Sequence, residues 1–278
     1  MRFTVWLVLL GILSATAGEK GATSDSGPSV TTIPASLRRQ YDLDKFYTKW
    51  IDADGIPILA SEVVDDEALG RARELVLRMT SKKHAAFAKA LARDRVRVAI
   101  LGRSQKTTDI PEHADLNRAF PETNWDERAR GLGATKARPA TSVGEENLLG
   151  LPGDRYRGES ILIHEFAHTL HMALRSIDKG FDRALLKTYA AALKDGLFEN
   201  TYAASNAEEY WAEGVQSWFD ANPERAEPDG VHNSINTRTE LEQYDPRLAK
   251  LIAKWLPSDD WRYEYPDAQD LGSEETDR

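Results

Sequence analysis

The sequence has 278 residues, of which 45 are acidic and 36 are basic, so its formal net charge at pH 7 is −9. A nucleic-acid partner normally requires a basic surface, and this charge balance argues against one. The chain contains no cysteine, which excludes disulfide bonds and every catalytic mechanism that needs a thiol.

The first 17 residues have the features of a secretory signal peptide. Arg2 supplies a positive charge, residues 3–13 form an apolar run, and Ala15-Thr16-Ala17 provides small residues for cleavage. The run is shorter than the roughly 20 residues that a transmembrane helix needs. We therefore predict that residues 1–17 are removed and that the mature chain is secreted, extracellular or periplasmic, with no membrane association.

The rest of the chain divides into three predicted parts. Residues 18–34 are rich in glycine, serine and threonine with almost no apolar content, so we predict a flexible linker or short pro-segment over residues 18–40. Residues 41–256 are long enough to fold as one domain. Residues 257–278 form an acidic tail whose aromatic residues are able to dock on that domain: Trp261, Tyr263 and Tyr265.

The N-terminal half of the domain is predicted to contain a small sheet. Residues 50–58 indicate a hairpin that turns at Asp54-Gly55. Residues 65–93 have the apolar spacing of two helices, and residues 96–101 are typical of a buried strand. Residues 103–158 are rich in loop-forming residues, with one edge strand expected around 140–149 that could pair with an extended ligand.

The C-terminal half is predicted to be mainly helical. Residues 160–175 are apolar nearly all round, which indicates a buried helix with Ser160 at its N-cap. Further helices are expected over residues 181–195, over 206–221 behind Asn206, and over 246–256. The fold class is therefore α+β, a small sheet followed by a mainly helical half, with the active cleft between them.

One helix carries the motif HExxH as His164, Glu165 and His168. Residues four apart lie on the same face of a helix, so both imidazoles can reach one ion. Neutral histidine nitrogens bind Zn²⁺ without cancelling its charge, the ion acidifies water, and Glu165 takes the proton as catalytic base. A metal also explains why three polar side chains stand in an otherwise apolar helix, although histidines that serve only as hydrogen-bonded core residues are the alternative.

A catalytic zinc needs a third protein ligand. Metzincins place a histidine ten residues after the first, where this chain has Leu174, so that class is excluded. Glu209 and Glu213 lie four apart on a predicted helix, so we assign Glu209 to the metal and Glu213 to the ring N–H of a ligand histidine. Glu208 is the competing ligand, but it would lack a second carboxylate one turn on, and a solvated glutamate face is the remaining alternative.

These residues resemble the gluzincin metallopeptidases, in which HExxH is completed by a glutamate on a later helix. The sequence Asn206, then Glu209-Tyr210-Trp211-Ala212-Glu213, is similar to the signature of the lethal-factor-like group of secreted zinc endopeptidases. The resemblance implies a zincin-like catalytic domain, one Zn²⁺ per chain with Glu209 as ligand, and a peptide or protein substrate. It also implies that Tyr202, seven residues before Glu209, donates to the oxyanion of the intermediate.

Two further histidines are candidates for supporting roles, His171 on the motif helix and His232 in a loop after the predicted helix over 206–221. His171 is a core residue or a support for the ligands, and His232 is a surface residue or a second candidate for oxyanion stabilisation. Two other functions also fit the motif: a catalytically inactive binding or structural protein with the zincin fold, and a zinc hydrolase of non-peptide amides or esters. The intact Glu165 favours an enzyme over the binding protein. The sequence gives no indication of an oligomeric state.

Overall fold

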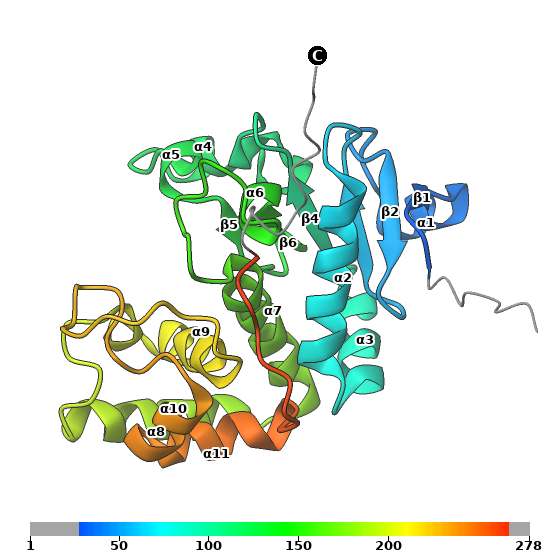
Figure 1. The fold of residues 1–278 in the computed structure, drawn as a ribbon. Helices are drawn as coiled ribbons and strands as arrows, with labels where there is room; N and C mark the ends of the chain where they lie inside the picture. The colour runs from blue at the N-terminus through cyan, green and yellow to red at the C-terminus, as the bar shows by residue number, and fades with distance from the viewer. Residues whose placement is uncertain (1–27, 267–278) are drawn as a thin grey trace, which may run out of the picture.

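The computed structural model of the protein describes residues 28–266, which form a mixed α+β structure (Figure 1). From residue 145 onward the described chain contains helices and no strand. The predicted α+β class, with its mainly helical C-terminal half, is therefore confirmed. The predicted signal peptide, and residues 267–278 of the predicted tail, lie outside the described residues. No helix within residues 28–266 has the length and apolar character that crossing a bilayer requires.

Six strands form one sheet in the order β1-β2-β3-β4-β6-β5. The pairs β3-β4 and β4-β6 are parallel, and the other three pairs are antiparallel. The β2-β3 hairpin turns at Asp54 and Gly55, as predicted, and both residues have a positive φ, of 51° and 98°. The strands are β1 (Thr31–Thr32), β2 (Lys49–Asp52), β3 (Pro57–Ala60), β4 (Arg97–Leu101), β5 (Gly131–Leu132) and β6 (Ala140–Gly144).

The two faces of the sheet belong to two separate apolar clusters. Side chains alternate along a strand, so neighbouring residues of β3 and β4 face opposite ways. One face joins the large core with α2 (Asp66–Thr80), α3 (His84–Arg93) and α7 (Ile161–Ile177), and the other joins a small cluster next to α1 (Ala35–Tyr41). The strand residues of the large core are Ile58, Ala60, Val98 and Ile100, and those of the small cluster are Leu59, Ala99 and Leu101.

The helical half packs onto the sheet half through α7 and α9 (Ala207–Trp218), which are in contact along their length. The indole of Trp211 is fully buried and donates to the carbonyl oxygen of Ala167 on α7, at 2.9 Å. The predicted N-caps are in place, because Ser160 accepts from the amide of Ile163 and Asn206 accepts from the amide of Glu209. These contacts fix α9 relative to α7.

Three more helices complete the C-terminal half: α8 (Phe181–Lys194), α10 (Arg238–Tyr244) and α11 (Pro246–Trp255). Residues 257–266, drawn in red in Figure 1, run back from α11 to the sheet half. The amide of Tyr263 donates to Phe219 O at 2.8 Å, and the hydroxyl of Tyr265 donates to Asp154 Oδ2 at 2.7 Å. This part of the predicted tail is therefore held against the folded body.

The loop-rich prediction for residues 103–158 misses three short helices, α4 (Leu116–Ala119), α5 (Trp125–Arg128) and α6 (Glu145–Leu148). The prediction of an edge strand around 140–149 is wrong, because β6 lies between β4 and β5 and all five of its residues are buried. The edge strand on this side of the sheet is β5, which has two residues and is too short for its sequence to show a periodic pattern.

Secondary structure also begins earlier than residue 41. Within the segment 18–40 that the sequence predicts as a linker, residues 31–32 form β1 and residues 35–40 belong to α1. The short strand needs only backbone pairing with β2, and Ile33 and Leu37 pack against the small cluster. The linker prediction is based on the low apolar content of residues 18–34, and a few contacts made by single residues do not change that content.

Candidate metal centre

Helix α7 brings His164 and His168 to one face, one turn apart. Their rings lie edge to face with centroids 4.9 Å apart, and their Nε2 atoms are 3.2 Å apart. His164 is 9% exposed, so its ring has little access to solvent and depends on neighbours for hydrogen bonds. Both rings contact residues of α9 (Ala207–Trp218).

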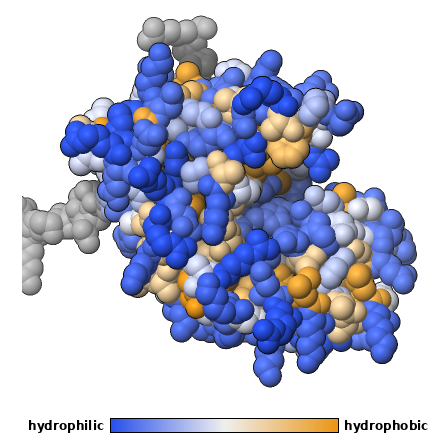
Figure 2. Space-filling view, turned by 180° about the vertical axis from the view of Figure 1, so that it is seen from behind, coloured by the Kyte–Doolittle hydropathy of each residue, from blue (hydrophilic) through white to orange (hydrophobic). Residues whose placement is uncertain are grey.

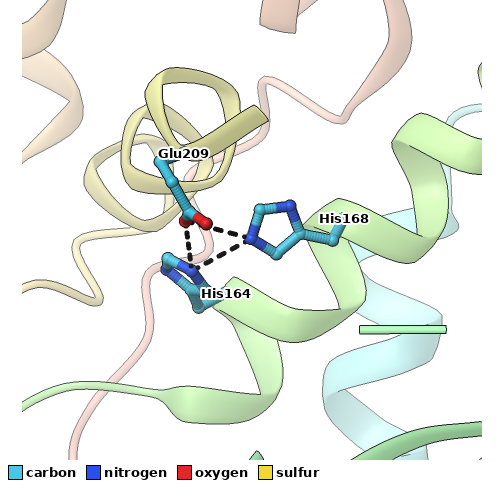
Figure 3. Close-up of side chains that lie close together, drawn as sticks. All are labelled: His164, His168 and Glu209. Carbon is cyan, nitrogen blue, oxygen red and sulfur yellow. Dashed lines mark hydrogen bonds and ion pairs between the residues drawn. The ribbon is translucent and has the colours of Figure 1, made fainter. Parts of the chain in front are cut away.

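Helix α9 supplies the third side chain of the cluster. Glu209 Oε2 lies 3.1 Å from His164 Nε2 and 3.2 Å from His168 Nε2, as drawn in Figure 3. Glu209 stands in the first turn of α9, because Asn206 caps that helix and accepts from the Glu209 amide at 2.9 Å. One ligand atom from each of the three residues therefore meets at one point between the two helices.

The spacing of these three atoms suits a tetrahedral metal ion. With zinc–ligand bonds of about 2.0–2.1 Å, neighbouring ligand atoms of a tetrahedron lie about 3.3 Å apart. The observed separations are 3.1 and 3.2 Å. A zinc ion would fit with shifts of a few tenths of an ångström, and the set of two imidazoles and one carboxylate is a common catalytic zinc set that leaves a fourth position open.

The other ring nitrogen of His164 is occupied by acceptors on α9. Gln216 Oε1 lies 2.7 Å from His164 Nδ1, and Glu213 Oε1 lies 3.4 Å from the same atom. Both are acceptors, so Nδ1 carries the proton and the Nε2 lone pair points to the metal position. Glu213 stands where the sequence places it, but Gln216 is the nearer partner.

Gln216 connects this contact to a further acid and histidine. Its amide nitrogen lies 3.3 Å from both Glu159 Oε2 and Ser160 O. Glu159 Oε2 in turn lies 3.5 Å from His232 Nε2. Burial lowers the pKa of His232, but Glu159 and the nearby Glu213 outweigh it, so the net shift is upward. His232 is not among the residues that line the cleft with the cluster, and it lies in a small separate pocket with Glu213.

The pKa values of two of the clustered residues, His164 and Glu209, are shifted in opposite directions. Burial disfavours the charged form of His164, but hydrogen bonds with Glu209 and Glu213 outweigh it and hold its pKa well above the ordinary value. Burial likewise raises the pKa of Glu209, but hydrogen bonds from His164 and His168 outweigh it and lower that pKa.

Glu165 faces the cleft beside this cluster. Burial raises its pKa, whereas a hydrogen bond from the backbone of Gly133 and the nearby imidazoles of His164 and His168 lower it, with a net upward shift. The close approach of the 131–133 segment requires glycine. A Cβ at Gly131 would lie 2.4 Å from Ile161, and one at Gly133 would lie 2.7 Å from His168.

Tyr202 forms the opposite wall, just before α9. Its ring stacks on that of His164 with centroids 6.4 Å apart, and its hydroxyl lies 3.3 Å from Glu209 Oε1. Burial raises its pKa and Glu209 raises it further, so the phenol stays protonated and able to donate. Tyr202 therefore lies beside the cluster, where the sequence places it.

A cleft with a volume of about 970 Å³ runs past the cluster. Seen from behind, the surface is hollowed between the upper and lower parts of the molecule (Figure 2). The residues 131–136 form one rim, α7 forms the floor, and Tyr202 and the start of α9 form the other rim. His164, Glu165, His168, Tyr202, Glu209 and Glu213 all line this cleft.

Glu208 and His171 take no part in the cluster. Glu208, the competing ligand in the sequence, pairs with Arg175 at 3.0 Å. His171 is buried and lies 2.8 Å from Asp182 Oδ1, against the ring of Phe181. The structure thus brings together the six residues that the sequence selects, and adds Gln216 and the glycines of the rim.

No protein-family model matches the chain, and no curated protein is significantly similar to it. Among solved structures, the chain is similar to the PRO-PRO endopeptidase (PPEP-2) from Paenibacillus alvei, at 16% sequence identity and a TM-score of 0.48. The similarity covers 71% of this chain and 96% of that chain. A similarity as weak as this does not establish the function of the chain.

Proposed function

We propose that this protein is a secreted zinc-dependent metallopeptidase of the gluzincin type, with one Zn²⁺ per chain. The observation that carries the proposal is the meeting of His164 Nε2, His168 Nε2 and Glu209 Oε2 at 3.1–3.2 Å, beside a carboxylate that opens to the cleft. Secretion rests on the signal-peptide features of residues 1–17.

When bound by these ligands, zinc supplies Lewis acidity that polarises a carbonyl group and acidifies water. Gln216 and Glu213 hold the ring of His164 in the tautomer that leaves Nε2 free. The packing of Trp211 on Ala167 keeps the glutamate ligand against the histidines. These contacts would orient the ligand atoms toward one metal position.

Glu165 acts as the general base and then as the general acid. Its carboxylate takes the proton of the attacking water and passes it to the nitrogen of the departing amine. Burial favours the protonated carboxyl and thus helps it to hold the proton between the two steps. Tyr202 donates from its hydroxyl to the oxygen that becomes negative in the tetrahedral intermediate.

A peptide is the substrate class that the cleft supports best. The strand β5 ends the sheet, and the rim of residues 131–136 lies along the cleft next to the candidate ligands. An extended peptide can pair with such an edge through its backbone. An amide or ester of a small molecule would use the same water activation, but it would fill only a part of this cleft.

Zinc content and peptide cleavage, measured on the same samples, test the proposal. Wild type is compared with Glu209→Ala and with Glu208→Ala, a matched control one residue away that contacts Arg175 instead of the cluster. We expect one zinc per chain in wild type and in Glu208→Ala, with cleavage of a mixed peptide library that a chelator abolishes. Glu209→Ala loses both.

The two other functions give different results in the same experiment. Zinc without cleavage of any peptide, but with hydrolysis of amide or ester model compounds, would point to a non-peptide hydrolase. Zinc with neither activity would point to a binding protein. A wild-type protein that binds no zinc would refute the proposal.

A further inference from the structure

The floor of the cleft indicates how long its occupant is. The residues of α7 that line it recur at spacings of three and four, from Ile161 to Ser176. At about 1.5 Å per residue, this face of the helix extends for roughly 22 Å. An extended peptide rises about 3.3 Å per residue, so the floor has room for roughly six residues.

The rim of residues 131–136 runs in the same direction as α7. Gly131 lies next to Ile161, Gly133 lies next to His168, and the amide of Ala134 donates to Thr169 Oγ1 at 3.0 Å. Residues 135 and 136 therefore lie toward the C-terminal end of α7. The cleft has two distinct ends, one on each side of the candidate ligands.

The end near the start of α7 is lined mainly by apolar and aromatic side chains, together with the charged residues Arg128 and Glu159. The apolar and aromatic residues are Trp125, Tyr156, Ile161 and Val231, of which Val231 is 44% exposed. Trp125 is half-buried and packs edge to face on Phe120, with centroids 5.9 Å apart. An exposed apolar residue and an anchored indole at the same end of the cleft form a place for a bulky apolar side chain.

The other end is lined by cations. Arg175 is neutralised by Asp182 and Glu208, each at 3.0 Å. Lys136 and Lys179 are exposed, and neither makes a hydrogen bond or an ion pair with another residue of the described chain. Lys136 also lies within electrostatic range of Asp94, which is itself paired with Arg93. In a chain with a net charge of −9, two ammonium groups at one end of a cleft favour a negatively charged ligand.

We propose that the substrate is a peptide with a bulky apolar residue on one side of the scissile bond and an acidic residue on the other. This inference rests on the proposed peptidase function and names its substrate class. Helix α7 continues for nine residues, or about 14 Å, beyond His168 to Ile177, and Lys179 follows two residues after its end, with a side chain long enough to span part of that distance. The acidic residue therefore lies two to four positions from the cleaved bond.

Matched peptides test the charge preference. Each peptide keeps one apolar residue at a fixed position, carries either Glu or Lys at the second to fourth position on the other side, and has both termini blocked. We expect wild type to cleave the Glu peptides about tenfold faster in kcat/KM than the Lys peptides. The double variant Lys136→Glu with Lys179→Glu should remove or reverse this ratio, because two surface charges are reversed.

The control variant carries the same change of charge away from the cleft, Lys187→Glu on α8 with Lys250→Glu on α11. It should keep the wild-type ratio. At the apolar end, Val231→Glu should slow the cleavage of peptides with a bulky apolar residue and leave the preference for Glu in place. Melting temperatures of all variants show whether each one folds.

A binding measurement separates failure of this inference from failure of the proposed function. Fluorescence anisotropy with the Glu165→Gln variant compares the same labelled peptides without turnover. Tighter binding of the Glu peptides, lost in the Lys136/Lys179 double variant and weakened by salt, supports the inference even if no peptide is cleaved. Equal binding and cleavage of the Glu and Lys peptides would overturn the inference. A preference for the apolar residue and the acidic residue on the same side of the scissile bond would also overturn it.

Discussion

Replacing Gln216 tests whether its hydrogen bond with His164 Nδ1 contributes to zinc affinity. Gln216→Met keeps nearly the same side-chain volume at a fully buried position but removes the oxygen that lies 2.7 Å from His164 Nδ1. Loss of such a partner typically weakens metal binding about 10- to 100-fold. Glu213 Oε1 remains 3.4 Å from the same nitrogen, so we expect the lower part of this range, about 10-fold, or ~1.4 kcal/mol.

The contribution of Glu213 becomes visible in a second variant. In Glu213→Met alone, Gln216 still fixes the ring, and zinc affinity should fall by less than about threefold, or ~0.7 kcal/mol. In the double variant both acceptors are removed, and the ring is free to turn. The loss should then exceed the sum of the two single losses, because each residue compensates for the other in the single variants.

The assay is zinc affinity from competition with a chromogenic chelator, measured at one pH on metal-free protein. Gln216→Met also removes the side-chain amide that donates to Glu159 and to the carbonyl of Ser160, which keeps only the backbone amide of His164, so thermal unfolding is followed separately to distinguish lost stability from lost affinity. Gln243→Met, at an exposed position of α10, serves as the control. Unchanged zinc affinity in the folded double variant would refute the role of Gln216 and Glu213 in orienting the imidazole of His164.

Three further outcomes are expected. Glu165→Gln should retain zinc and lower kcat by about 10²–10⁴-fold, and a variant with normal turnover would remove Glu165 as the base. Tyr202→Phe should lower kcat by about 10²-fold or more with KM nearly unchanged, whereas a change in KM alone would assign Tyr202 to substrate binding. Burial lowers the pKa of His113 from 6.5 to about 4, so the stability it contributes is complete above pH 6.5 and lost as the pH falls toward 4. The loss amounts to about 3 kcal/mol. In His113→Gln, the free energy of unfolding from denaturant titrations should therefore depend less on pH between 6.5 and 4. A pH dependence as steep as that of wild type would contradict this.

The ligand set was readable from the sequence because helix geometry is local. Residues four apart share a face, which joins His164 to His168 and distinguishes Glu209, with Glu213 one turn on, from Glu208. The same reasoning gives α7, α9 and their caps within a few residues. In each case the prediction depended on a period of 3.6 residues and on neighbours in the chain.

The features of the site and the sheet that the sequence does not predict depend on tertiary contacts. Gln216 is a neutral amide on a buried helix, and only the packing of α9 on α7 brings it to His164. Gly131 and Gly133 look like ordinary loop glycines until the rim lies on α7, where a Cβ would clash. The sequence predicts an edge strand within the loop-rich segment 103–158, whereas β6 is paired on both sides by β4 and β5, and such pairing between distant segments leaves no local pattern in the sequence.

The arrangement of the cluster indicates that a metal would serve chemistry more than folding. In small zinc domains, the ligands come together only when the ion binds. Here two packed helices already hold the three ligand atoms near the separations of a tetrahedron, through the bond from Trp211 to Ala167 and the cap at Asn206. Residues 257–266 further tie the helical half to the sheet half. The core therefore supports a site that is preorganised, and its fourth position opens to the cleft, which is what turnover requires and what a structural site would close.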